Sequence, residues 1–285
     1  MIKVNLMKAL FIHEKNDSEI EKLKTAFNKK SISVELVEIG KIGLLTEGKE
    51  TSLILDSLSL ENIDSCFLSV GVEFTQFVEP LLDEFSQKGI YCQVKPDSYS
   101  MLSSKAFQLT TLTSHGIKTP NTTIFGSSYF INASLKEFRF PLILQVFDGY
   151  KKIQDVLVES EKSLLSIVKS IKSDFDVLLL QEFFNKDLDV SAVIGENVFT
   201  VRRPWIKEKL EYAKKGSSRT LSEKEQKNVI NACNAIGIEI ATVKSIDGNI
   251  VSLKPSIDFS FFQEIIGKNL YETTAEFYLS KFKKE

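Results

Sequence analysis

The sequence predicts an α/β fold in which an N-terminal domain, built on a parallel sheet, precedes two lobes that combine helices with strands. Strand-like and helix-like segments alternate over residues 7–95, and this alternation favours a parallel sheet covered by helices. After Ser98 the pattern changes, and strands follow one another across short turns. The 285 residues are 43% hydrophobic and 26% charged, which is typical of a globular chain long enough for more than one domain. We expect domains at 1–96, 97–177 and 178–285.

The N-terminal elements follow from the spacing of the apolar residues. Short apolar runs predict strands at residues 9–12, 33–39, 66–70 and 90–94. Asp17 and Ser18 offer an N-cap to a helix whose apolar positions recur at helical spacing. A second helix is expected over 74–87, because its periodic pattern ends at the pair Lys88-Gly89, a favourable C-cap.

Caps and turns define the elements in the rest of the chain. A helix is expected over 105–114, since a glycine and then a proline follow it. Ser222 and Glu225 have the spacing of a capping box, which predicts the start of another helix. The sequence Asp-Gly-Asn at 247–249 predicts a hairpin turn. The apolar run 259–262 suits either the core or a subunit interface. The remaining elements are helices at 160–172 and 269–282, strands at 122–125, 141–147, 177–184, 190–194, 198–201, 243–246 and 250–253, and a solvated loop at 207–215.

Composition and charge exclude several classes of protein. The 36 basic and 38 acidic residues leave a net charge of −2, so no nucleic-acid partner is expected. No apolar stretch reaches the ~20 residues that cross a bilayer, and residues 1–8 lack the apolar core of a signal peptide. We therefore expect a cytoplasmic protein with no membrane partner. The three cysteines are scattered and suggest neither a disulfide framework nor a zinc site. No catalytic motif surrounds His13, expected in a loop after a strand, or His115, expected at a helix end.

Five segments, taken in chain order, carry the most informative motifs. They are the helix at 105–114 with the following Gly116-Ile117-Lys118-Thr119-Pro120, and the segments 140–145, 178–184, 189–195 and 222–237. In this order they resemble the lysine-bearing helix with its "GIPxP" segment, the "FPVVIKP" strand, the "LVQEFI" hinge, the "DIRxFVVG" strand and the "TPEE…ALGL" helix of ATP-grasp carboxylate–amine ligases of the RimK (glutamate ligase) type. The resemblance covers nearly the whole chain, from Lys8 to about Phe282, and implies an ATP-grasp fold with an N-terminal pre-ATP-grasp domain.

The resemblance also implies a chemistry and a metal site. Ligases of this family make an acyl-phosphate from a carboxylate and ATP, and an amine then displaces the phosphate. Their magnesium ligands are an Asp on one C-terminal strand and a Glu-x-Asn on the next. The matching positions here hold Lys244, Ser252 and Lys254, whereas a hard dication prefers carboxylate and amide oxygens. The resemblance therefore implies a place for ATP, while we expect no metal ligands and no magnesium.

Other parts of the family's site have changed as well. A phosphate-contacting lysine is Gln145, the arginine of "DIR" is Ser191, and the glycine-rich flap is reduced to 148–152, where Lys151 and Lys152 still supply charge. The resemblance leaves the catalytic residues unassigned. The nucleotide-binding residues that it implies are Lys105, Gln145, Gln181, Glu182, Phe183, Phe184 and Asp189. The residues expected to contact an anion or a substrate are Arg202, Arg203, Lys244 and Lys254.

Two groups of basic residues leave alternatives open. Arg202 and Arg203, next to Trp205, suit the binding of a carboxylate or a phosphate. The alternative is an exposed strand pair with the indole packed between subdomains. Lys244 and Lys254 are simply exposed, or pair with carboxylates of the hinge and of the strand that follows it, or bind an anionic ligand directly.

Three functional hypotheses follow. The leading one is a degenerate ATP-grasp protein that has lost metal-dependent ligation, and that keeps a nucleotide or another anionic small molecule in its cleft or serves as the partner of an active paralogue. The alternative is an active ATP-dependent carboxylate–amine ligase whose metal site is rewired through Glu182, Asp189, Asp247 or Asp258. The third is a purely structural subunit. We expect the chain to form a homo-oligomer, or a hetero-oligomer with the active paralogue.

Overall fold

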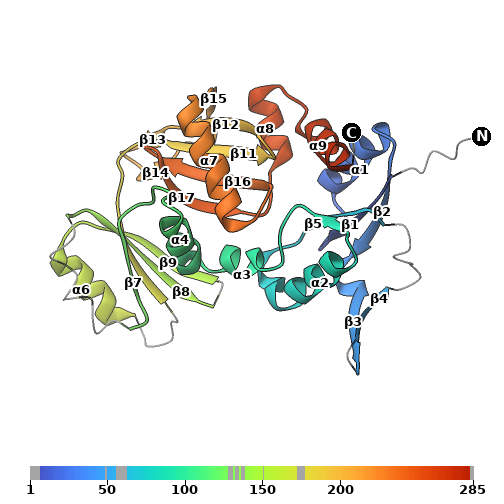
Figure 1. Ribbon diagram of the computed structural model, residues 1–285. Coiled ribbons are helices and arrows are strands. Elements are labelled where there is room, and N and C mark those ends of the chain that lie inside the picture. The colour runs from blue at the N-terminus through green and yellow to red at the C-terminus, as the bar shows by residue number, and fades with distance from the viewer. Residues whose placement is uncertain are drawn as a thin grey trace, which may run out of the picture.

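The computed structural model describes residues 7–48, 50–55, 63–127, 131, 135, 139–149, 151–171 and 177–282. Three units lie in a row, with the C-terminal lobe between the N-terminal domain and the small central lobe (Figure 1). Parallel and antiparallel sheets are both covered by helices, which confirms the predicted α/β class. Among the described residues, no helix combines the length and the apolar character that a membrane span requires.

The N-terminal domain contains the predicted parallel sheet, in the order β2-β1-β5-β6. Its strands are β1 (Met7–His13), β2 (Ile32–Glu38), β5 (Ser65–Ser69) and β6 (Tyr91–Cys92), and its helices are α1 (Ser18–Lys29) and α2 (Thr75–Gln87). Asp17 caps α1, because its side chain accepts hydrogen bonds from the backbone of Glu19 and Ile20. The chain leaves β1 toward one edge of the sheet and β5 toward the other. The carboxyl ends of these two strands therefore form a switch-point crevice, the usual ligand position in such sheets.

Two features of this domain differ from the prediction. His13 is the last residue of β1 and is buried, so the expected loop position was wrong. A two-stranded ribbon, β3 (Ile42–Glu47) and β4 (Glu50–Leu55), was not predicted, and it projects from the domain (Figure 1). Its inner side chains, Leu44 and Leu53, pack on the domain core, while Leu45 and Ile54 are exposed on the other side.

The central lobe is an antiparallel sheet in the order β7-β10-β8-β9, and helix α6 (Glu161–Ser170) packs on one of its faces. The strands are β7 (Thr122–Phe125), β8 (Leu142–Asp148), β9 (Lys151–Val158) and β10 (Val177–Glu182). Leu144 and Leu178 form the core with Leu164 of α6. Strand β9 was not predicted, and Lys172 at the expected helix end lies outside the described residues. The pairing of β10 with β7 and β8 carries this sheet through Glu182, beyond the range 97–177 expected for the lobe.

The C-terminal lobe is a five-stranded sheet with helices on both faces, in the order β15-β12-β11-β16-β17. Helix α7 packs on one face, and α8 and α9 pack on the other. The predicted capping box of Ser222 and Glu225 starts α7, and Gly237, with φ of 83°, ends it. The elements are β11 (Leu188–Ile194), β12 (Asn197–Arg203), β15 (Ser217–Arg219), β16 (Ile240–Ile246), β17 (Asn249–Lys254), α7 (Glu223–Ile236), α8 (Phe259–Ile266) and α9 (Leu270–Phe282).

Two segments of this lobe settle what the sequence left open. The apolar run at 259–262 begins α8, and Phe259 and Phe262 are buried in the shared core. The expected loop at 207–215 contains one side of a short ribbon, β13 (Trp205–Ile206) and β14 (Glu211–Tyr212).

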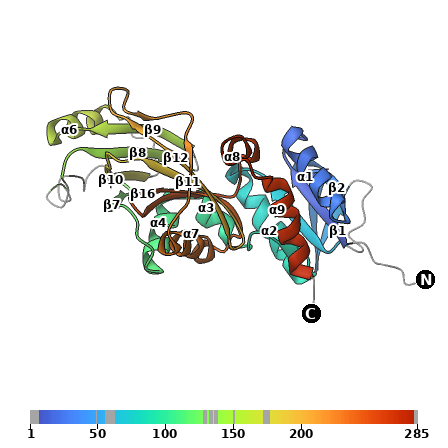
Figure 2. The same cartoon turned by 90° about the horizontal axis from the view of Figure 1, so that it is seen from above.

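The ends of the chain tie the N-terminal domain to the C-terminal lobe. Helix α9 lies alongside α1 (Figure 2). The Tyr278 ring packs against Phe27 and Tyr91, and its hydroxyl lies 2.9 Å from the Cys66 carbonyl oxygen. Helices α3 (Ser98–Ser103) and α4 (Lys105–Ser114) pack against α7. These contacts make a cleft where the carboxyl ends of the N-terminal sheet, α4 and the two lobes meet.

Candidate functional site

A cavity of about 430 Å³ occupies this cleft. The N-terminal sheet contributes Glu14 and Ser69, which follow or end β1 and β5 at the switch point. Helix α4 contributes Lys105, strand β8 contributes Phe147, and β17 contributes Ser252 and Lys254. All three units of the fold therefore line one cavity, which makes it the candidate ligand site.

The three positions that resemble the family's metal ligands lie together. Lys244 of β16 stands opposite Ser252 of β17, and Thr242 stands opposite Lys254. Because cross-strand partners share a face and side chains alternate along a strand, Lys244, Ser252 and Lys254 project from the same face of the sheet. Burial, and then the charge of Lys254, lower the pKa of the half-buried Lys244 amine. The structure thus brings two amines to the place where the family has carboxylate and amide ligands.

The opposite wall adds further positive charge. Lys105, the first residue of α4, is half-buried. Burial, followed by the charge of Lys152 on β9, lowers its pKa from 10.5 to about 7, and Lys244 contributes in the same direction. The sequence indicated that Lys152 could supply charge, but not that it would face Lys105 and Lys244.

One carboxylate near these amines is already paired, and Glu14 and Glu73 line the cavity from the N-terminal side. Asp155 of β9 lies 2.5 Å from Lys152 Nζ and accepts a 3.4 Å hydrogen bond from Gln145 Nε2. Gln145 Oε1 is buried with no hydrogen-bond partner within the described chain. Gln145 pairs with Asp155 and alternates with Leu144 and Val146 of the α6 core, so it lies on the other face of the sheet and offers an acceptor rather than a positive charge. Asp155 was not among the residues that the sequence predicted for the site.

This set of donors does not fit a magnesium ion. Among the described residues, no three His, Cys, Asp or Glu side chains come together in a way that could hold a metal. The positions expected for the ion hold two amines and one hydroxyl, and protonated amines repel a dication. The residues present therefore suit an anion and not a divalent cation.

Asp189 and Arg202 lie on the other face of the C-terminal sheet, away from the cavity. Arg202 donates two hydrogen bonds to the buried Asp189 carboxylate, at 2.9 and 3.0 Å, and Arg219 also binds it. Arg219 in turn donates to Glu225 in the first turn of α7, at 2.6 Å. Val190 pairs with Lys244 across β11 and β16, so these two side chains share one face of the sheet. Asp189 is the neighbour of Val190 in the strand, and its side chain therefore lies on the opposite face. Asp189 and Arg202 form a structural ion network under α7.

Arg203 and Trp205 make different contacts from Arg202. Arg203 follows Arg202 in β12, so its side chain lies on the opposite face of the sheet. Arg203 shares the face of Lys244, whose pKa its charge helps to lower, and its Nε donates to the Ala213 carbonyl oxygen at 2.6 Å. The Trp205 ring packs edge-on against Phe183, with 5.5 Å between centroids, and against Tyr212. The indole therefore packs against the hinge and its own ribbon, while the two arginines are half-buried and not an exposed strand pair.

The four hinge residues at 181–184 do not act as one group. Gln181 is buried and donates to Thr122 Oγ1 at 3.0 Å, and the Glu182 backbone N–H donates to the Asn121 carbonyl oxygen at 2.8 Å. Glu182 and Phe183 line a separate cavity of about 350 Å³. Phe184 packs on the core under α8 and α9. The hinge joins the lobes, and only Glu182 and Phe183 border open space there.

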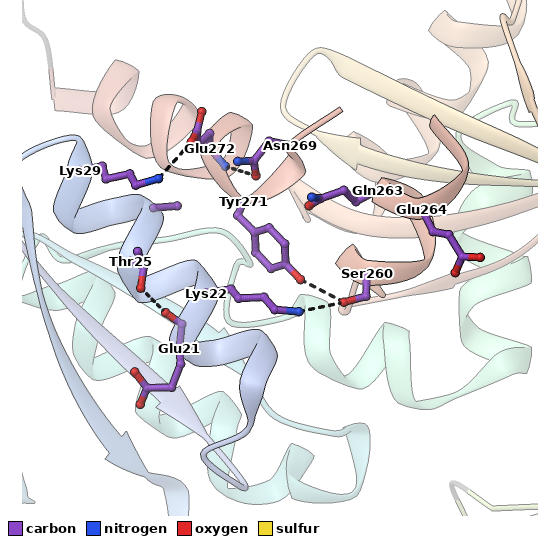
Figure 3. A pocket seen from close by; sticks show the side chains of 11 residues that line it. Glu21, Lys22, Thr25, Lys29, Ser260, Gln263, Glu264, Asn269, Tyr271 and Glu272 are labelled. Carbon is purple, nitrogen blue, oxygen red and sulfur yellow. Dashed lines mark hydrogen bonds and ion pairs between the residues drawn. The ribbon is translucent and has the colours of Figure 1, made fainter. Parts of the chain in front are cut away.

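A larger cavity, of about 660 Å³, lies elsewhere, between α1 and the helices α8 and α9 (Figure 3). One ion pair crosses it, since Lys29 Nζ lies 3.7 Å from a Glu272 carboxylate oxygen. Lys22 and Tyr271 both point to Ser260. This groove is the joint between the N-terminal domain and the end of the chain.

Comparisons with known proteins agree with this geometry. A family model described as "RimK-like ATP-grasp domain" matches residues 103–259. A probable alpha-L-glutamate ligase of Haemophilus influenzae is 27% identical over 194 residues, which are 65% of this chain and 64% of that protein. One from Histophilus somni is 25% identical over 192 residues, with the same coverage. The chain thus spans about 64% of the length of these relatives.

Solved structures show the same fold at low identity. The ATP-grasp ligase PsnB, complexed with a minimal precursor, has a TM-score of 0.77 at 12% identity, over 97% of this chain and 99% of that chain. The macrocyclase MdnC from Microcystis aeruginosa, bound with the precursor peptide MdnA, has a TM-score of 0.68 at 15% identity, over 96% and 100% of the two chains. The family model alone covers more than half of the 285 residues. This chain belongs to the RimK-like ATP-grasp family.

Proposed function

We propose that this RimK-like protein binds a nucleotide polyphosphate in the cleft between its lobes through lysine side chains, without magnesium, and that it does not catalyse ligation. The observation that carries this proposal is that Lys244, Ser252 and Lys254 project together from the face where the family's metal ligands belong. Lysine binds phosphate as a point charge. Two tethered ammonium groups therefore take over the neutralising role of the ion.

A polyphosphate suits the charge and the position of the cavity. Lys105 and Lys254 line the cavity, and Lys152 and Lys244 are near enough to lower the pKa of Lys105. A polyanion in the cavity therefore meets several positive charges. Solved relatives of this fold include PsnB complexed with AMPPNP and PsnB complexed with Mg and ADP. These complexes support a nucleoside polyphosphate as the class of ligand to test first.

The proposed loss of ligation follows from the difference between a magnesium ion and an ammonium group. A magnesium ion bridges two phosphate oxygens and stabilises the charge that develops in phosphoryl transfer. A lysine carries a single charge and holds one group at a time. Removing the dication therefore removes most of the electrostatic stabilisation of the transition state.

The rewired metal site is not favoured by the positions of its four carboxylates. Asp189 is engaged by two arginines on the far face, and Glu182 borders the hinge cavity. Asp258 caps α8 through a 2.9 Å bond from the Phe261 backbone, and Asp247 lies in the β16–β17 turn with φ of 50°. These groups do not converge on the cavity.

Isothermal titration of ATP, in EDTA and in excess magnesium, tests the proposal. We expect ATP to bind in EDTA, and magnesium to leave the affinity unchanged or to weaken it, since the ion competes with the lysines for the phosphates. The variant Lys244→Met/Lys254→Met should lose at least about tenfold in affinity. Lys22→Met, a lysine of the α1 groove, is the matched control and should bind as the parent does. Tight binding that requires magnesium would overturn the proposal.

The partner paralogue, the oligomeric state and the cytoplasmic location stay predictions. The assignment of a non-catalytic partner role rests on the same cleft. Co-purification with an intact ligase of the family, and mass measurement of the pure chain in solution, would test these predictions.

A further inference from the structure

The Lys105 amine stands in an unusual position. It projects from the first residue of α4, and a positive charge there opposes the helix dipole. No hydrogen bond or ion pair to its Nζ is present within the described chain, although Asp155 is near enough to favour the charged form. Its other charged neighbours, Lys152 and Lys244, are cations. A half-buried amine thus faces positive charge from two further elements at one side of a 430 Å³ cavity.

We propose that the cleft takes up its anionic ligand together with a proton, and that the proton goes to Lys105. This inference rests on the proposed function and names a property of the same site. Burial and the neighbouring cations disfavour the protonated Lys105 amine in the empty cleft, and a bound anion changes the balance of charge around it. The bond that forms is the N–H bond of the ammonium, and solvent supplies the proton.

The charged groups around Lys105 come from every element that packs near it. Strand β9 supplies Lys152 and the carboxylate of Asp155, which are paired with each other at 2.5 Å. Strand β16 supplies Lys244. The further wall of the cavity adds Lys254 from β17, and Glu14 and Glu73 from the N-terminal side. Strand β8 contributes the neutral side chains of Gln145 and Phe147.

The carboxylates offset the cations at Lys105 only in part, since Asp155 favours the protonated amine while Lys152 and Lys244 oppose it. Asp155 is held by Lys152, and Glu14 accepts a 2.5 Å hydrogen bond from the Gly71 backbone. The charges that act on Lys105 beyond Asp155 are both positive. A ligand with several negative charges, placed among these lysines, is the change that makes the protonated form of Lys105 favourable.

The direction and the size of the proton uptake follow from linkage. An amine with a pKa of about 7 is roughly nine-tenths neutral at pH 8. Restoring its ordinary value on binding takes up about 0.9 protons per ligand at that pH. Phosphates surrounded by cations become stronger acids, so the ligand itself only releases protons. Net uptake therefore identifies a protein group.

Titration calorimetry of the full chain with ATP in EDTA measures the uptake. At pH 8, in buffers of different ionisation enthalpy such as HEPES and Tris, the slope of observed enthalpy against buffer enthalpy gives the number of protons. We expect an uptake close to about 0.9. The affinity should also fall about eightfold between pH 7.5 and pH 8.5, because each bound ligand needs the protonated amine.

Two variants assign the proton. Lys105→Arg keeps a charge at every pH in this range, so it should bind ATP with no uptake and with an affinity that is flat in pH. Lys254→Met removes an exposed lysine from the same cavity and should weaken binding while keeping the uptake.

The outcomes separate this inference from the proposed function. Binding of ATP in EDTA with zero uptake by the parent chain, or with full uptake by Lys105→Arg, overturns the inference and leaves the proposed function standing. Absence of binding at pH 7 and at pH 8 overturns the proposed function, and the inference with it.

Discussion

Lys244 stands directly opposite Ser252 across the β16–β17 pair, on the face of the C-terminal sheet that borders the cleft. An amine and a hydroxyl therefore occupy neighbouring positions on adjacent strands. Lys254 follows Ser252 at the next position on the same side of β17. The fold of the family is retained. Under the proposed function, the side chains at these positions no longer bind a dication.

Restoring the oxygen ligands should restore the response to magnesium. In the variant Lys244→Asp/Ser252→Glu/Lys254→Asn, we expect ATP to bind at least about tenfold more tightly with magnesium than in EDTA, since carboxylate and amide oxygens then meet the ion. Calorimetric titration measures both affinities. The single change Ser252→Glu is the control and should not produce this dependence. A triple variant that is indifferent to magnesium would show that the strand positions have been misassigned.

Removing the Lys105 amine should stabilise the protein at neutral pH. The pKa of Lys105 in the folded state, about 7, lies below the ordinary 10.5. Between these two pH values the folded state therefore binds fewer protons than the unfolded state. The free-energy cost of burying the charged amine is complete below pH 7 and disappears near pH 10.5. Lys105→Met should raise the free energy of unfolding by about 2 kcal/mol at pH 7, since water still reaches part of the amine. Urea unfolding at several pH values should show this gain shrinking as the pH rises.

The control for that series is Lys22→Met on the surface of α1, whose effect on unfolding should not change with pH in the same way. A Lys105→Met variant whose gain is constant from pH 7 to pH 10 would contradict the charge balance described for the cleft.

Asp189 should matter for stability and not for ligand binding. Asp189→Asn leaves the two guanidinium groups of Arg202 and Arg219 without their carboxylate. A loss of about 2–4 kcal/mol in the free energy of unfolding is expected, because breaking a buried ion network exposes unpaired charge. Chemical unfolding checks the loss, and titration with ATP should give the affinity of the parent. A selective loss of ATP binding with unchanged stability would place Asp189 in the site.

Glu225 should contribute stability that acid removes. The Ser222 backbone N–H, then its hydroxyl and Arg219, hold the Glu225 pKa at about 2, below the ordinary 4.5. A carboxyl group whose pKa is lowered in the folded state stabilises the fold above about pH 4.5, and this stabilisation is lost as the pH falls toward 2. Glu225→Ala should cost about 1 kcal/mol at pH 7 and almost nothing near pH 2, measured by urea unfolding. Glu223→Ala, in the same helical turn, is the control. An equal cost at both pH values would contradict the assignment.

The sequence predicted the elements whose hydrophobic pattern is local. The strands β1, β2 and β5 have apolar runs, and the capping box of Ser222 and Glu225 is visible in four residues. Strand β9 was missed because its residues Lys151 to Asp155 are mostly polar, as an edge strand beside a cleft permits. The ribbon β3–β4 was missed because polar residues interrupt its apolar positions and because Leu45 and Ile54 face solvent.

The site was predictable where it depended on position within a motif. Lys244, Ser252 and Lys254 were expected together, and the strand register places them on one face. Asp189 and Arg202 were expected in the site, but which face a strand residue occupies depends on the sheet register and on where α7 packs. The pairing of Lys152 with Asp155 and their approach to Lys105 depend on how two lobes meet, which local spacing does not encode.

The most direct test of the central claim is a crystal grown with ADP and manganese, examined by anomalous scattering at the manganese edge. We predict nucleotide phosphates held among Lys105, Lys244 and Lys254, with no manganese bound to protein side chains in the cleft. A manganese ion coordinated octahedrally there, with carboxylate oxygens of this chain among its ligands, would contradict the proposal that lysines have replaced the metal.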